Sequence, residues 1–259
     1  MAAIERVYGD NREAIAYLEG DLLRNALDIW SLGFEGGRNE LYVVREQGKM
    51  VAHLSIYHAP EADYVNVGGR ESEIGPLLTL IPGRAVVFLT LKGFLAAKGN
   101  LKPDSVILND MMLVRRGEER LVRPGLAVRL SEKDAAEYAG FGSSFNSPPA
   151  PIEWAREGLA DHPVFGVFDD GRLASVASVT ASLPDVAVIM GVETRRDFRR
   201  RGYGSAVVSA ATREALRRSK SCVLWVASRN AEALGLYRRI GFMKIGEEMW
   251  LDFGTGLTP

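Results

Sequence analysis

A run of arginines and glycines in the C-terminal half has the residue types and spacing to hold a phosphorylated ligand. Residues 199–204 read Arg-Arg-Arg-Gly-Tyr-Gly. Because glycine lacks a Cβ, Gly202 and Gly204 let the backbone approach a ligand closely and adopt a positive φ. A helix that begins here points its free N–H groups and positive dipole end at the turn, and such a site binds a diphosphate. The arginines add charged, forked donors.

Two better-known nucleotide turns do not fit these residues. A Walker loop ends in Gly-Lys-Ser/Thr, and no such ending follows Gly204. A dinucleotide fingerprint needs a third glycine in G-x-G-x-x-G spacing, where this chain has Val207. The pattern is instead Arg-x-x-Gly-x-Gly, and a strand ending with Val192 and Thr194 is expected just before it.

A second set of residues follows at a distance that makes a chance match to the first one improbable. After a short apolar strand come Asn230, an alanine three residues on, the pair Leu236-Tyr237, and then Gly241-Phe242. In this order and separation the two sets resemble the two signatures of the GNAT N-acetyltransferase superfamily. The resemblance covers roughly residues 126–259, about half of the chain.

The resemblance implies a GNAT acyl-CoA N-acyltransferase fold, which is a mixed α/β (α+β) sheet with helices on its faces. It also implies transfer of an acetyl or short acyl group from acetyl-CoA to a primary amine, by direct attack in a ternary complex. The pantetheine of the cofactor is then expected along the end of the strand that precedes the turn, where a backbone N–H polarises the acyl carbonyl. The residues expected to hold the cofactor are Val192, Thr194, Arg199, Arg200, Arg201, Gly202, Tyr203, Gly204, Ser205 and Asn230.

The same resemblance gives candidates for catalysis. Tyr237 is expected near the sulfur as general acid, because an unperturbed tyrosine pKa of about 10 suits donation to a thiolate. The general base is Glu193 or Asp185, one near each end of the preceding strand. Glu193 alternates with its neighbours and so points to the opposite face from them. Structural alternatives stay open: Tyr237 as a core aromatic and Asn230 as a helix cap only.

The local patterns supply the elements that position these residues. Alanines and valines at helical spacing predict an amphipathic helix over 202–220. A short strand over 222–227, a helix capped by Asn230 and a closing strand over 243–253 follow. Upstream, the segment 163–180 predicts a hairpin with an Asp-Gly turn. From residue 126 the expected order is strand, two helices, three strands, helix, strand, helix, strand.

The N-terminal part contains a weaker copy of this order. A helix is expected from Asn11 toward Ala26. It is followed by a hairpin over 41–57 and by segments that echo the later strands and helix, namely 64–69, 71–81 and 86–91. Gly68-Gly69 occupies the place of the phosphate turn but lacks the arginine spacing. We therefore expect a degenerate GNAT-like unit over 1–123, as in glycine N-acyltransferase-like proteins, or an unrelated lid domain, and a catalytic domain over 124–259.

Composition excludes several other functions. The 259 residues carry a net charge of −1, which gives no general attraction to nucleic acid or membranes. A lone cysteine, Cys222, and three scattered histidines predict neither a disulfide framework nor a metal site. Without a leader or an apolar run of ~18 residues, a cytoplasmic protein is expected. The expected partner is a small-molecule amine, with a protein amine, a homodimer and a non-catalytic CoA sensor or scaffold left open.

Overall fold

The computed structural model describes residues 3–8, 11–33, 39–59, 62–141 and 151–256. Contacts divide the chain into two compact units. The first comprises Met1–Met111, Val226–Arg229 and Ile245–Pro259, and the second comprises Met112–Trp225 and Asn230–Lys244. The functional boundary expected between residues 123 and 124 stays a prediction, because compactness alone does not show where function divides.

The second unit is built on a mixed sheet in the order β11-β10-β9-β8-β7. Neighbouring strands are antiparallel except for β10 and β11, which are parallel. The hairpin between β8 and β9 turns at Asp170 and Gly171, whose φ values of 48° and 75° suit the Asp-Gly turn that the sequence predicted. The strands are β7 (Val128–Arg129), β8 (Val164–Asp169), β9 (Arg172–Ser182), β10 (Val186–Thr194) and β11 (Ser221–Ala227).

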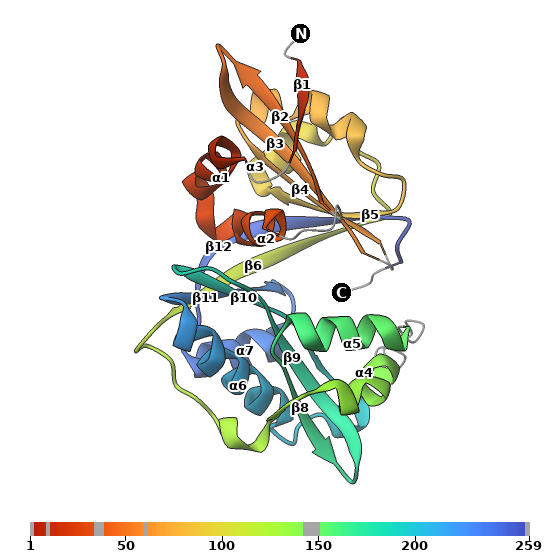
Figure 1. Ribbon diagram of the computed structural model, residues 1–259, viewed down its shortest axis with the longest axis vertical. Coiled ribbons are helices and arrows are strands. Elements are labelled where there is room, and N and C mark those ends of the chain that lie inside the picture. Colours follow the sequence, from red (N-terminus) through yellow and green to blue (C-terminus); the bar gives the residue numbers. More distant parts are fainter. Residues whose placement is uncertain (1–2, 9–10, 34–38, 60–61, 142–150, 257–259) are drawn as a thin grey trace. The chain divides into compact units, whose positions relative to one another are not determined.

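Helices cover both faces of this sheet, with α6 and α7 on one side and α4 and α5 on the other (Figure 1). Ser131 and Asp134 form a capping box at η5, which leads into α4, and the Ser131 N–H donates to Asp134 Oδ2 over 2.8 Å. The helices and 3₁₀ turns are η4 (Pro124–Leu126), η5 (Glu132–Asp134), α4 (Ala135–Phe141), α5 (Ile152–Asp161), η7 (Arg196–Phe198), α6 (Tyr203–Arg218) and α7 (Ala231–Ile240).

The first unit repeats this strand order. Its sheet runs β1-β2-β3-β4-β5-β12, in which only β4 and β5 are parallel. A hairpin, a third antiparallel strand and a parallel partner thus recur in both units, as expected for a GNAT-like repeat. The strands are β1 (Ile4–Val7), β2 (Asn39–Glu46), β3 (Lys49–His58), β4 (Asp63–Gly69), β5 (Ala85–Thr90) and β12 (Met243–Phe253), and β6 (Ser105–Arg115) contributes residues to both units.

Two helical predictions in this unit were wrong. The helix expected from Asn11 toward Ala26 is two helices separated by a 3₁₀ turn at Gly20, and the segment 71–81 forms two 3₁₀ turns rather than an α-helix. Pro76 explains the second case, since it has no N–H and cannot make the α-helical bond to the carbonyl four residues before it. The elements are α1 (Arg12–Leu18), η1 (Glu19–Asp21), α2 (Leu22–Leu32), η2 (Glu71–Glu73), η3 (Gly75–Leu80) and α3 (Leu91–Ala97).

A buried polar cluster links α2 to the sheet of the first unit. Asp28 accepts hydrogen bonds from the Ser55 hydroxyl and the Asn66 amide, and burial raises its pKa to about 6. Burial likewise raises the pKa of Glu248 on β12 to about 7, although the Trp250 indole donates to its carboxylate over 3.0 Å. Each carboxylate has hydrogen-bond partners, so the cluster holds the helix against the sheet.

In the ranges that the structure describes, no helix combines the length and the apolar character that crossing a membrane requires.

Candidate functional site

The turn before α6 has the backbone that the two glycines predicted. Gly202 is the N-cap of α6, with φ 84° and ψ 4° in the left-handed region. A Cβ on Gly202 would meet no atom within 4 Å, so the constraint there is the backbone conformation and the adjoining space is open. The first helical bond runs from the Ala206 N–H to the Gly202 carbonyl over 3.1 Å. The amides of Gly202, Tyr203, Gly204 and Ser205 therefore have no acceptor within the helix.

Gly204 has a different task. A Cβ at this position would lie 3.2 Å from Thr194 Oγ1 and 3.2 Å from Leu236 Cδ1. The missing side chain thus allows the first turn of α6 to lie directly against the end of β10 and against α7. One glycine shapes the turn, and the other brings it next to the strand.

The arginines of the turn are largely engaged with the protein itself. Arg200 pairs with Glu232 over 2.9 Å and Arg201 with Asp169 over 2.7 Å, and all but Asp169 are exposed. Arg199 donates from Nε to the Thr194 carbonyl over 3.3 Å. An anion at this turn would therefore meet backbone amides and partly neutralised arginines, rather than the three free charges suggested by the sequence.

A gap between the two parallel strands leads to this turn. β10 pairs with β11 over three positions only, Val186–Val188 with Ser221–Val223. Beyond Val188, β10 continues to Thr194 without a paired residue on β11 among the described residues. One edge of β10 consequently offers backbone N–H and C=O groups along Ile189–Thr194.

A bulge reshapes β10 within the gap. Met190 pairs with Ser178 and Glu193 with Val176, so β10 holds one extra residue there, and Gly191 has φ 59°. The buried Ser175 hydroxyl then fixes the strand end, donating to the Glu193 carbonyl over 2.8 Å and bonding Thr194 Oγ1 over 2.8 Å. Sequence reasoning missed both Gly191 and Ser175, although a glycine inside a strand pattern is a recognised bulge signal.

Asn230 lies at the N-terminus of α7 and Tyr237 lies within this helix, as the sequence pattern predicted. Asn230 caps α7, since its Oδ1 accepts the Ala233 N–H over 3.1 Å. Tyr237 is 5% exposed and lies edge-on to Phe242 with ring centroids 6.0 Å apart. Its hydroxyl has no hydrogen-bond partner among the described residues. Burial raises the pKa of Tyr237 far above the ordinary tyrosine value that the sequence argument used.

The two candidate bases have very different surroundings. Asp185 forms an ion pair with Lys220 at the start of β10. This position is roughly 26 Å of strand from the far end, at about 3.3 Å per residue. Glu193 lies at that far end, beside the gap, and desolvation raises its pKa although part of the side chain reaches solvent. Geometry therefore favours Glu193 over Asp185.

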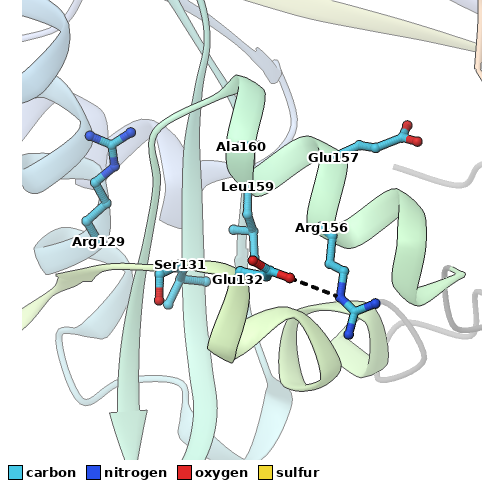
Figure 2. A pocket seen from close by; sticks show the side chains of 8 residues that line it. Arg129, Ser131, Glu132, Arg156, Glu157, Leu159 and Ala160 are labelled. Carbon is cyan, nitrogen blue, oxygen red and sulfur yellow. Dashed lines mark ion pairs between the residues drawn. The ribbon is translucent and has the colours of Figure 1, made fainter.

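A distinct hollow of about 520 Å³ lies between β7, η5 and α5 (Figure 2). Arg156 and Glu132 form an ion pair of 3.7 Å across it. It is open and lined by none of the residues assigned above to cofactor binding or catalysis, so the functional assignment rests on the β10 gap instead. Its lining residues are Arg129, Leu130, Ser131, Glu132, Arg156, Glu157, Leu159 and Ala160.

Comparisons with known proteins agree with this geometry. The model of the FR47-like protein family matches residues 164–251, which run from β8 to β12. No curated protein matches the sequence.

Solved structures resemble the whole chain. A Drosophila protein is 15% identical with a TM-score of 0.74, covering 99% of this chain and 100% of its own. A tandem GNAT protein from the clavulanic acid biosynthesis pathway is 15% identical with a TM-score of 0.59, covering 99% and 100%. A GCN5-related N-acetyltransferase from Sphaerobacter thermophilus is 15% identical with a TM-score of 0.56, covering 99% and 98%. The FR47-like model thus matches the part of the chain from β8 to β12, and the chain shares the fold of tandem GNAT proteins over nearly its full length.

Proposed function

We propose that this protein is an acyl-CoA-dependent N-acyltransferase, which moves an acetyl or short acyl group from coenzyme A to a primary amine of a small molecule. The observation that carries the proposal is the early end of β10–β11 pairing at Val188, which opens a gap that leads to the N-terminus of α6. The remaining arguments concern whether coenzyme A fits there and what the neighbouring side chains do.

The residues present fit the two polar parts of coenzyme A. A diphosphate needs several converging donors, and the amides from Gly202 to Ser205 supply them next to open space. The amide groups of pantetheine need a free strand edge, and β10 offers one from Ile189 to Thr194. We expect Val192, Thr194 and Asn230 to border this path. When bound, the acyl thioester supplies an activated acyl carbon.

Backbone N–H groups at the bulge in β10 are suited to donate a hydrogen bond to an oxyanion. The extra residue around Gly191 and Val192 takes backbone N–H groups out of the ladder with β9. An amide that points into the gap stabilises negative charge on an acyl oxygen, and such preorganised donors are worth roughly 10²–10³ in rate.

Glu193 suits the role of general base. An amine must lose its proton to become a nucleophile, and a carboxylate accepts that proton best when its pKa approaches the working pH. Desolvation raises the pKa of Glu193 in that direction. The carboxylate lies on the face of β10 opposite to Thr194, so proton acceptance and cofactor binding use different sides of the strand.

Tyr237 suits hydrogen-bond donation to a leaving thiolate. Its hydroxyl is free to face a ligand, and its raised pKa keeps it protonated across the working range. A thiol has a pKa of about 8.5, well below that of this tyrosine, so complete proton transfer from Tyr237 to the thiolate is unfavourable. We expect a charge-assisted hydrogen bond that stabilises the thiolate as it forms.

Two measurements test the proposal together. Calorimetry with acetyl-CoA should give saturable binding, and a thiol-release assay with a panel of primary amines should give turnover. Absence of binding to well-folded protein would contradict the cofactor assignment. Binding without turnover would favour a CoA sensor, and turnover restricted to peptide amines would favour a protein acceptor.

A further inference from the structure

The end of β10 presents its side chains alternately to two different sides. Thr194 faces the phosphate turn, since its Oγ1 is close to Gly204. Glu193 and Arg195 therefore face the other side, where α4 lies. The charge of Glu193 adds to burial in raising the pKa of the half-buried Tyr138 on α4. The Arg195 guanidinium lies over the buried Phe141 ring, 5.1 Å from its centroid.

Arg195 differs from three nearby arginines in having no carboxylate partner among the described residues. Arg172, Arg200 and Arg201 each form an ion pair, with Asp197, Glu232 and Asp169 respectively. No described residue pairs with Arg195, and its buried Nε has no hydrogen-bond partner among them. A guanidinium that lies over an aromatic ring is attracted by the ring without using its N–H donors, which leaves these donors for an anion.

The Arg195 guanidinium and the candidate base, Glu193, are close enough in the chain to contact the same small molecule. Two residues along a strand correspond to about 7 Å, and both side chains are long enough to converge on one small molecule. Desolvation, and not a neighbouring cation, accounts for the altered pKa of Glu193. Among the described residues no ion pair joins Arg195 and Glu193, so each is available to a ligand.

We propose that the acceptor is a small amine that also carries a carboxylate, and that Arg195 binds this carboxylate while Glu193 receives the proton of the amine. The inference rests on the proposed N-acyltransferase function and names its substrate class. The planar fork of arginine matches a carboxylate in a bidentate way. It matches a phosphate equally, so the test includes a phosphate arm that separates the two groups. Because Arg195 lies on the opposite face of β10 from the phosphate turn, it is a specificity residue for the acceptor and not a ligand of the cofactor.

The test uses acceptor pairs that differ in charge, with acetyl-CoA as donor. Beta-alanine is compared with propylamine, glycine with glycinamide, and O-phosphoethanolamine serves as the phosphate arm. The variants are Arg195→Gln and Arg195→Lys. Arg196→Gln is the matched control, because this neighbouring arginine is exposed and lies in the 3₁₀ turn η7, beyond the end of β10.

The wild-type protein should prefer the carboxylate member of each pair. Arg195→Gln should lower kcat/KM for that member by about 10²-fold, the value of a charge-assisted hydrogen-bond pair. The neutral amine and the affinity for CoA should be unchanged, Arg195→Lys should recover part of the loss, and Arg196→Gln should behave as wild type.

Three results would overturn the inference, each with a different meaning for the function. Turnover that favours neutral amines or the phosphate arm removes the carboxylate assignment and leaves the N-acyltransferase intact. Weaker CoA binding in Arg195→Gln moves Arg195 into the cofactor site. No turnover with any amine, in a protein that binds acetyl-CoA, removes both the function and the inference.

Discussion

The two units share a strand order, but they differ in the length over which their two parallel strands stay paired. In the first unit β4 and β5 pair over five positions, Asp63–Val67 with Ala85–Leu89, almost to the end of β4 at Gly69. In the second unit the corresponding pair separates after Val188, and β10 runs on to Thr194. A shared topology therefore does not reproduce the free strand edge that a pantetheine requires.

The segments that follow β10 and β4 also differ between the two units. The second unit continues into α6, a helix of 16 residues whose N-terminal amides border the gap. The first unit continues into η2 and η3, of 3 and 6 residues, because Gly75 and Pro76 disfavour an α-helix. Without a long helix after β4, this segment of the first unit lacks the aligned amides and dipole of an anion site.

The glycines of the two units show why residue type alone misleads. Gly202 has open space beside it, whereas a Cβ on Gly68 would lie 2.5 Å from His53 Cε1. A Cβ on Gly69 would lie 2.5 Å from both the Ala52 Cα and the Tyr17 hydroxyl. The glycines of the first unit permit close packing, and the glycine of the second permits ligand approach. The comparison therefore favours the second unit over the first as the place of the proposed cofactor site.

The largest expected effect comes from Gly202→Asp. A carboxylate next to a bound diphosphate repels it by about 4 kcal/mol at 4 Å and an effective dielectric of 20, so CoA affinity should fall about 10³-fold. Gly48→Asp is the matched control in the first unit, with φ 78° and no atom within 4 Å of its Cβ, against φ 84° for Gly202. Calorimetry with CoA should separate the two, and an equal loss in both would remove the phosphate assignment.

Glu193→Gln should have the next largest effect, lowering kcat by roughly 10²–10⁴ if Glu193 is the base. Activity should be lost as pH falls through the pKa of Glu193, which burial raises, and this acidic limb should be missing in the variant. A carboxyl whose folded pKa is raised loses stability as pH rises through that value, so Gln should not destabilise the neutral-pH fold. Asp185→Asn, at the other end of β10, is the control, and an unchanged acidic limb in Glu193→Gln would exclude Glu193.

Tyr237→Phe should lower kcat by about 10–10²-fold with little change in KM, since the lost hydrogen bond stabilises the thiolate only as it forms. The raised pKa of Tyr237 means that no basic limb should disappear from the pH profile. Tyr17→Phe in the first unit removes a hydroxyl whose pKa burial also raises, and serves as control. Wild-type turnover by Tyr237→Phe would make Tyr237 a core aromatic only.

The sequence predicted much of the second unit because its signals are local. Asp170-Gly171 specifies a hairpin by its own φ preferences, Ser131 caps a helix through a residue three positions on, and Gly202 marks a left-handed N-cap. Each depends on residues within a few positions, so spacing alone was sufficient.

The parts that sequence reasoning missed depend on long-range contacts. The Arg201–Asp169 pair joins residues 32 apart, and the Ser175–Thr194 bond joins residues 19 apart. The burial of Tyr237, which changes its pKa, is likewise set by tertiary packing. The length over which β10 and β11 remain paired also depends on the whole sheet, because strand pairing is decided by neighbours rather than by intrinsic preference.

The smallest expected effect tests the first unit. Gly68→Ala should lower the free energy of unfolding by about 1–3 kcal/mol, the range for overpacking a filled interior. The His53 ring that it meets is 2% exposed, and burial lowers its pKa to about 4, so it is neutral at pH 7 and enclosed. Gly75→Ala, whose Cβ meets no atom within 4 Å, is the control. Urea unfolding should separate these variants while their CoA affinities stay equal. If folded Gly68→Ala instead lost CoA affinity, the first unit would contribute to the cofactor site. Packing strain against His53 can change CoA binding only if the two regions are coupled.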